Sequence, residues 1–346
     1  MESGRGGSLR VRSAGFENQT FEFKDYEAIP SNALMADLLK RSQGDMNLWI
    51  DLEEPDFSVF PVLSQFFAIS EERIQVCYQG EGHPLQFESD VGLFRTRRVF
   101  YHFETESCSG RPLVFLMKGR AIVTLHPKTL SRTVGHVFST IKSRGSEFLS
   151  DSPTPVISLL FDELIEDYKP VIEDWQDELD TFEQQAVHNP SEELLSSILR
   201  FKKLVTQLRH ALNGEFRDQR LLLMRCPESL IRPEQRHQLE KSIASFQKLL
   251  VEIEDIRQHS ASAYQVYAAA LSLEMTRASN QMNRIMERLS VVTSVFMPLT
   301  FIVGVYGMNI PDIPELSVKG FYYFLWGLMV VLAGALLYLF KKLKWY

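Results

Sequence analysis

Hydrophobic and polar residues are distributed differently in the two halves of this 346-residue chain. Up to about residue 145, short apolar runs rich in β-branched and aromatic residues alternate with polar turns. This alternation predicts a small sheet with helices packed on it. The predicted strands are 47–52, 98–103, 113–117 and 120–125, and 60–69 is predicted to be helical. We therefore expect an N-terminal α/β domain over 16–150, after a disordered Gly-, Ser- and Arg-rich tail over 1–15.

From Pro155 onward the strand signals stop and long helical patterns follow, over about 155–188, 191–224 and from 234 into an apolar segment. The first is strongly acidic, which is typical of a solvated face or, alternatively, of a cation-attracting surface beside a permeation route. The 64 residues from Glu234 to Met297 contain no proline. At about 1.5 Å per residue they would form a rod on the order of 100 Å long. We expect 151–288 to form a helical funnel and stalk that leads to a membrane.

Two uncharged segments near the C-terminus are each long enough to cross a membrane. Leu289–Ile310 and Phe321–Phe340 contain no charged residue over 22 and 20 positions, and a hydrocarbon core is about 30 Å thick. We therefore predict an α+β membrane protein with a C-terminal two-helix transmembrane hairpin. Its spans are 289–310 and 321–340, its connecting loop is 311–320, and a basic tail covers 341–346.

The orientation of this hairpin follows from its flanking charges. Before the first span stand Arg277, Arg284 and Arg288, and after the second stand Lys341, Lys342 and Lys344. The loop carries one Lys against Asp312 and Glu315. The positive-inside rule then places both termini in the cytoplasm and the loop outside. We expect an integral protein of the cell (inner) membrane.

The first span is the better candidate for lining a pore, because it carries small and polar residues. Two helices cannot enclose a hydrophilic path, so several copies must assemble around an axis. A stripe with alternating intervals of three and four, the spacing of a heptad seam, contains Asn283, Met286, Ser290, Thr293, Met297, Thr300 and Gly304. It continues backward through Gln258, Ser262, Gln265, Ala269, Ser272, Thr276 and Ser279. Such a seam fits a wide wetted channel, although small residues also let membrane helices pack closely.

The tetrapeptide Tyr306-Gly307-Met308-Asn309 ends the first span. Pro298, inside the span, leaves the carbonyl of Ser294 without its usual donor, so a kink or a hydrated carbonyl is expected there. Gly307 permits the chain to leave the helix, and Asn309 can present its side-chain oxygen at the mouth of a pore. Gly and Asn also favour an ordinary C-terminal helix turn.

Composition excludes several classes of function. The net charge of −7 disfavours a nucleic-acid partner. The three cysteines lie far apart, which indicates neither a disulfide framework nor a zinc knuckle, and the histidines lack close metal-ligand spacing. No GxxxxGK[ST] loop is present, and no nucleophile–base pair can be assembled. We expect no enzyme and no cofactor.

Several segments of the chain together resemble the CorA family of magnesium transporters. They are Phe296–Ile302, Tyr306–Asn309, Pro314-Glu315-Leu316 and Lys341–Trp345, with Trp49–Leu52 and the acidic helix Leu160–Ala186 upstream. The Gly-Met-Asn motif in a terminal two-span hairpin is highly specific. The resemblance implies a homopentamer in which a cytoplasmic funnel leads to a pore lined by the first span.

The resemblance also implies roles for individual residues. Asn309 would form the outer ring that selects the hydrated cation, shaped by Gly307 and Met308. The implied pore-lining residues are Asn283, Met286, Leu289, Thr293, Met297, Thr300 and Gly304, of which Met286 and Leu289 would form an apolar gate. Leu289 lies one residue off the heptad seam, so its place in the pore follows from the resemblance. Lys341, Lys342 and Lys344 would form a basic collar, and Glu315 is the loop acid near the entrance.

The stalk departs from the family pattern, since it is about one heptad longer. Gln265 and Lys241 stand where family members carry acidic residues for regulatory Mg²⁺, which puts magnesium-sensing closure in doubt. The leading hypothesis is uptake of Mg²⁺, with Co²⁺ or Ni²⁺ as side substrates. The alternatives are a Zn²⁺ transporter of the same architecture and, in a different class, a membrane-anchored sensor or scaffold.

Overall fold

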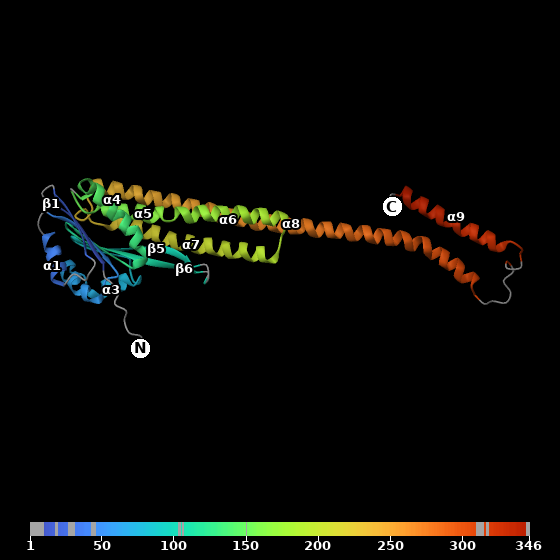
Figure 1. Cartoon of the computed structure of the whole chain (residues 1–346), viewed down its shortest axis with the longest axis horizontal. Helices are drawn as coiled ribbons and strands as arrows, with labels where there is room; N and C mark the ends of the chain where they lie inside the picture. Colours follow the sequence, from blue (N-terminus) through green and yellow to red (C-terminus); the bar gives the residue numbers. More distant parts are fainter. Residues whose placement is uncertain are drawn as a thin grey trace, which may run out of the picture. The chain divides into compact units, whose positions relative to one another are not determined.

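The computed structural model describes residues 10–17, 20–26, 32–42, 46–102, 105, 107–149, 151–308, 315 and 318–343 (Figure 1). The chain divides into two compact units, Met1–Val266 and Tyr267–Tyr346. The boundary falls within α8 (Pro233–Tyr306). Each unit has its own internal packing.

The first unit contains a seven-stranded mixed sheet in the order β2-β1-β3-β7-β6-β5-β4. The strands are β1 (Arg10–Glu17), β2 (Thr20–Tyr26), β3 (Asn47–Glu53), β4 (Leu85–Glu88), β5 (Val91–His102), β6 (Ser107–Lys118) and β7 (Ala121–His126). Only β3 and β7 pair in parallel among the described strands. The predicted strands are confirmed, apart from residue 120, which lies in a turn, and residue 103, which lies outside the described residues.

Helices cover both faces of the sheet. Alternation along β3 sends Leu48, Ile50 and Leu52 to a core shared with α1 (Asn32–Arg41), α2 (Phe60–Phe67) and α3 (Glu71–Tyr78). Trp49 points to the other core, where it stacks on Phe138 of α4 (Ser131–Leu149) with ring centroids 3.9 Å apart. The same core receives residues of α5 (Pro155–Glu166) and α7 (Glu192–Arg225).

A helix break divides the acidic segment that the sequence predicts as one helix over 155–188. It consists of α5 and α6 (Lys169–His188), separated at Asp167 and Tyr168. Asp167 pairs with Arg98 at 2.7 Å, and the Tyr168 hydroxyl accepts a hydrogen bond from the Val99 amide at 2.7 Å. The break therefore anchors the helical segment to β5, and Pro170 in the first turn of α6 is its sequence signal.

A buried charge cluster joins three strands beside the parallel pair. Asp51 of β3 lies 3.2 Å from Arg12 of β1 and 3.2 Å from the His126 ring of β7, and all three are at most 4% exposed. Thr124 donates a hydrogen bond to the Asp51 carboxylate at 2.6 Å. Arg12 also lies 3.6 Å from Glu53. Two cations and two carboxylates thus balance one another inside the domain.

The predicted disordered tail over 1–15 is wrong for residues 10–15, which belong to β1. Val11 and Ala14 are fully buried there, and Arg12 is buried through its ion pairs. The charge of Arg12 interrupts the apolar alternation that would identify the strand. Residues 1–9 lie outside the described residues.

The geometry around His126 fixes its protonation state. Its Nδ1 faces the Pro127 carbonyl oxygen at 2.9 Å, and its Nε2 faces the Asp51 carboxylate. Both partners only accept hydrogen bonds, so both ring nitrogens must donate. Burial opposes the charged ring, but Asp51 outweighs it and the pKa of His126 is raised. Burial likewise opposes the Asp51 carboxylate, yet His126 and Arg12 keep the pKa of Asp51 lowered.

Replacing His126 with Gln is expected to destabilise the first unit by about 3–5 kcal/mol, because it leaves a buried carboxylate short of a partner. The folded pKa of His126 lies above its unfolded value. Its contribution is therefore complete below the unfolded pKa of about 6.5 and is lost as pH rises through the folded pKa. The melting temperature of the full-length protein in detergent can be followed by tryptophan fluorescence. The difference in melting temperature between wild type and His126→Gln should shrink at alkaline pH. A difference that is constant with pH would contradict a charged His126.

Candidate functional site

The second unit is a hairpin of two helices that are long and apolar enough to cross a membrane, judged by length and composition. The end of α8 runs antiparallel to α9 (Phe321–Lys342) (Figure 1). The Tyr306 and Phe321 rings lie 5.4 Å apart at the turn. Gly320 precedes α9 with φ of 96°, a left-handed conformation that glycine adopts without strain.

One face of α8 packs towards α9. Val291 and Val295 are buried, and Ile302 and Tyr306 are partly buried at the following turns. The partly buried positions of α9 recur with the same spacing: 321, 325, 329, 332, 333, 336 and 340. This reciprocal burial defines the hairpin interface.

The predicted pore-lining residues lie on the opposite side of α8. At about 100° per residue, Thr293, Met297 and Gly304 project away from the Val291–Val295 face. All seven are exposed in the isolated chain: Asn283, Met286, Leu289, Thr293, Met297, Thr300 and Gly304. Met297 is 67% exposed although it lies in the middle of a membrane-length segment. The hairpin therefore leaves this stripe uncovered.

A second stripe, apolar and exposed, runs beside the polar one and was missed in the sequence. It consists of Leu271, Met275, Ala278, Met282, Ile285 and Leu289, again at intervals of three and four. Each directly precedes a member of the polar stripe in the sequence, as Leu289 precedes Ser290. Met275 and Met282 are 67% and 58% exposed. Leu289 thus belongs to a regular apolar seam that borders the polar stripe, and only the period of the apolar residues could have revealed it.

The polar groups on the uncovered side of α8 include a threonine hydroxyl that is hydrogen-bonded to the helix backbone. Thr293 donates a hydrogen bond to the Leu289 carbonyl at 2.9 Å, so its oxygen lone pairs remain free to accept. Pro298 lies inside α8 as predicted. Because proline lacks an N–H, the carbonyl of Ser294 has no i+4 donor.

At Gly307, where the first span ends, the backbone is not left-handed. A side chain is excluded there because the backbone of the preceding turn is too close. The Gly307 amide donates to the Val303 carbonyl at 2.9 Å, and the φ of Gly307 is not positive. A Cβ atom at this position would lie 2.9 Å from the Val303 oxygen, closer than real Cβ atoms approach backbone. Met308 follows with an exposed side chain. The predicted selecting residue Asn309 lies outside the described residues.

The remaining predicted residues flank the hairpin. Glu315 is exposed, and its carbonyl accepts from the Val318 amide at 3.3 Å. Lys341 and Lys342 are exposed in the last turn of α9. Lys344 lies outside the described residues. The basic collar and the loop acid therefore stay predictions.

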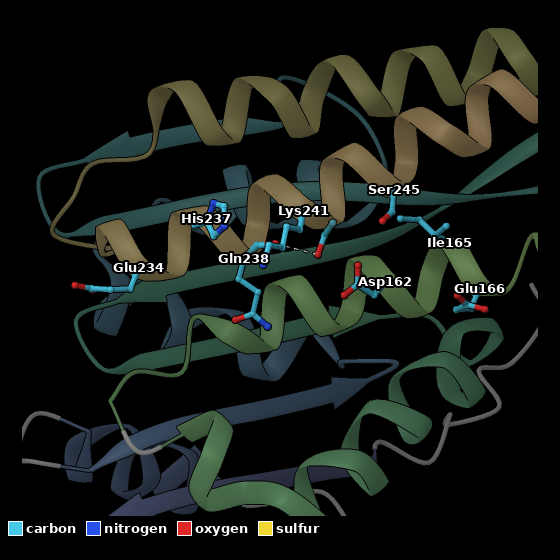
Figure 2. Close-up of a pocket in the computed structure, with 9 residues that line it drawn as sticks. Asp162, Ile165, Glu166, Glu234, His237, Gln238, Lys241 and Ser245 are labelled. Carbon is cyan, nitrogen blue, oxygen red and sulfur yellow. Dashed lines mark hydrogen bonds between the residues drawn. The ribbon is translucent and has the colours of Figure 1, made fainter.

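Lys241, which the family resemblance sets at a regulatory acidic position, lines a cavity of ≈ 720 Å³ between α5 and α8 (Figure 2). Asp162 and Glu166 enter it from α5, with Glu234 and His237 from α8. Burial raises the pKa of the Asp162 carboxyl, and Glu166 adds to this rise. Within the described ranges, no group of three or more His, Cys, Asp or Glu residues could hold a metal ion. Gln265, the second departure, is exposed on α8.

Comparisons with known proteins agree with this arrangement of a mixed-sheet domain, a long helix and an apolar hairpin. The complete structure of the CorA magnesium transporter from Methanocaldococcus jannaschii matches with a TM-score of 0.60 at 19% identity, covering 97% of this chain and 98% of that one. The chain thus has the fold of that structure, a mixed-sheet domain followed by a long helix and an apolar hairpin.

Sequence comparison places the chain in a family. The profile of the CorA-like Mg²⁺ transporter proteins matches residues 44–342, so the chain belongs to this family. The cobalt/magnesium transport protein CorA of Thermotoga maritima is 29% identical over 195 residues, which are 54% of this chain and 51% of that protein. The magnesium transport protein CorA of Escherichia coli is 26% identical over 329 residues, 92% of this chain and 98% of that protein.

Replacing Gly307 with Ala is expected to lower cation flux and to destabilise the hairpin by roughly 1–3 kcal/mol, because the added methyl group meets a backbone oxygen. Gly334→Ala is the matched control, since a Cβ there meets nothing within 4 Å. That change should leave cation flux unaltered and raise the free energy of unfolding of the hairpin by about 0.5–1 kcal/mol. Flux in proteoliposomes and thermal unfolding measure both effects. Equal behaviour of the two variants would refute the close-packing account.

Proposed function

We propose that this protein transports divalent cations across the membrane, with Mg²⁺ as the main substrate and Co²⁺ or Ni²⁺ as side substrates. The path is a pore lined by α8, and the electrochemical gradient drives uptake. The observation that carries the proposal is the uncovered polar stripe opposite α9, in a chain of the CorA-like Mg²⁺ transporter family. A lipid-facing helix has no use for such a stripe.

The paired stripes support an assembly of several copies, and we propose a homopentamer. An apolar seam at Met275, Met282 and Ile285 is suited to contact a neighbouring α8 by heptad packing. The adjacent polar stripe then faces the axis and remains hydrated. A dry bundle would place apolar residues at both seams.

The chemistry of the polar stripe favours a hydrated hard cation. Its members offer hydroxyl, amide and thioether groups and no carboxylate, thiol or imidazole. Mg²⁺ loses its water reluctantly, so neutral oxygens can hold the ion through its hydration shell. Asn309 provides such an amide oxygen at the outer mouth, and Gly307 and Met308 shape it. Near the inner end, Met286 and Leu289 form an apolar constriction that excludes water when the pore is closed.

Zn²⁺ transport by the same architecture is the alternative within this class. Zn²⁺ prefers sulfur and nitrogen ligands, and the polar stripe carries neither Cys nor His. A sensor or scaffold anchored by the hairpin is the alternative from another class. A sensor or scaffold of this kind does not explain why a polar stripe runs through a membrane-length helix. Family membership also supports transport over catalysis.

Asn309→Ala is expected to abolish Mg²⁺ uptake in a magnesium-dependent strain, because the mouth loses its amide ring. The protein level should stay normal. Asn213→Ala, an exposed amide on α7, is the control and should transport like wild type. Competition by Co²⁺, Ni²⁺ and Zn²⁺ in proteoliposomes ranks the ions. Undiminished uptake by Asn309→Ala would overturn the role of Asn309, and preference for Zn²⁺ over Mg²⁺ would establish the alternative substrate.

Met282→Glu is expected to dissociate the assembly, because each carboxylate would be buried in a helix seam at a cost of several kcal/mol. Met224→Glu on α7 is the matched control, since Met224 is 73% exposed and lies in the first unit. Light scattering of the detergent-solubilised protein should give about five chains for wild type and Met224→Glu, and fewer for Met282→Glu. An unchanged mass for Met282→Glu would exclude the apolar seam from the interface.

A further inference from the structure

Three arginines form a stripe on α8 immediately before the apolar span. Arg277, Arg284 and Arg288 follow one another at intervals of seven and four, so they share one face of the helix. All three are exposed, and within the described part of the chain no carboxylate forms an ion pair with any of them. With Asn280, Gln281 and Ile285 they line a cavity of ≈ 670 Å³.

This stripe points away from both seams of α8. At about 100° per residue, Arg284 and Arg288 lie on the same face as Val291 and Val295, which pack towards α9. The polar stripe and the apolar seam lie on the other sides of the helix. In an assembly built on those seams, the arginines therefore face outward, towards the membrane surface.

The charges around the stripe are predominantly basic. α9 runs antiparallel to α8, so its last turn, with Lys341 and Lys342, lies at the same end of the hairpin as the arginines (Figure 1). The acids of this part of α8 are Glu274 and Glu287, which lie three residues from Arg277 and Arg284 and so border the arginine face. Five basic groups thus meet two acidic ones where the hairpin leaves the hydrocarbon.

We infer that Arg284 and Arg288 bind the phosphate of an anionic phospholipid headgroup in the cytoplasmic leaflet, with Arg277 adding long-range attraction. Guanidinium groups match phosphate oxygens in bidentate geometry, and the hollow beside them is open to the surroundings of the helix. The inference requires only that the hairpin lies in a membrane. It holds whether or not α8 lines a pore.

The position of each arginine along the helix axis predicts how much it contributes to the affinity for anionic lipid. Arg288 directly precedes the uncharged segment, and Arg284 lies about 6 Å further from it along the axis. Arg277 lies about 16 Å from Arg288, beyond a Debye length of roughly 8–10 Å. Each arginine near the surface is worth about fivefold in affinity for anionic lipid. The contribution of Arg277 should be clearly smaller.

The test uses the full-length protein in detergent, titrated with phosphatidylglycerol or phosphatidylcholine, with bound lipid counted by native mass spectrometry. The double variant Arg284→Gln with Arg288→Gln should lose roughly 25-fold in affinity for phosphatidylglycerol. Arg277→Gln should lose less than fivefold. The control is Arg217→Gln with Arg225→Gln, two exposed arginines of α7, which should bind like wild type. Phosphatidylcholine binding should not change in any variant.

Two further arms keep the outcome decisive. The charge-conserving variant Arg284→Lys with Arg288→Lys should retain most of the phosphatidylglycerol, which separates charge from folding. Excess inorganic phosphate should fail to displace the lipid, because the acyl chains anchor it. Wild-type affinity in the double Gln variant would overturn the site, as would complete displacement by inorganic phosphate. Because lipid binding is read without flux, failure of the transport proposal would leave this result interpretable.

Discussion

The packing of α9 on α8 covers one side of a membrane-length helix and leaves the other sides to be covered by something outside the chain. Val291 and Val295 make the covered face. Thr293, Met297 and Gly304 point the opposite way, and the Thr293 hydroxyl would be solvated poorly by lipid and well by water. A hairpin cannot resolve this conflict alone. Several copies of the same helix can resolve it, because the apolar seam of each copy would pack against the neighbouring copy while the polar stripe beside it faces water.

The first unit has the opposite character, since several of its buried polar groups pair with one another. Glu215 of α7 is 1% exposed and accepts from the Arg97 amide at 2.8 Å and from its guanidinium at 2.6 Å. Arg236 donates to the carbonyl of Cys226 at 2.8 Å and also to that of Leu223, and so joins the start of α8 to the end of α7. The Glu215 bonds link elements 118 residues apart, and the Arg236 bonds close the turn between α7 and α8. They hold α7 to the sheet and fix the first turns of α8 against α7.

Sequence predicted those parts whose signals are local. The strands at 47–52 and 120–125 are apolar runs between turns, and the two spans are uncharged over membrane length, so both were identified correctly. The strand containing Arg12 was missed, because its burial depends on Asp51 and Glu53, which are distant in sequence. The break at Asp167 and Tyr168 was missed for the same reason, since its partners lie on β5.

The candidate site was predicted in the same uneven way. The polar stripe was visible because its period is regular, whereas the apolar seam beside it was overlooked in favour of the polar residues. The Gly-Met-Asn motif identified the mouth, but the steric reason for Gly307 required coordinates, since it is a contact with a carbonyl one turn earlier. Side-chain chemistry alone gives no such distance.

His126 carries one more consequence. An imidazole held between two acceptors gains a proton when the chain folds at a pH between about 6.5, above which the free ring is mostly neutral, and the raised pKa of the folded His126. In that range, folding of the first unit consumes a proton, and its stability falls as the pH rises. The sheet that supports the helices then holds a proton that the unfolded chain lacks.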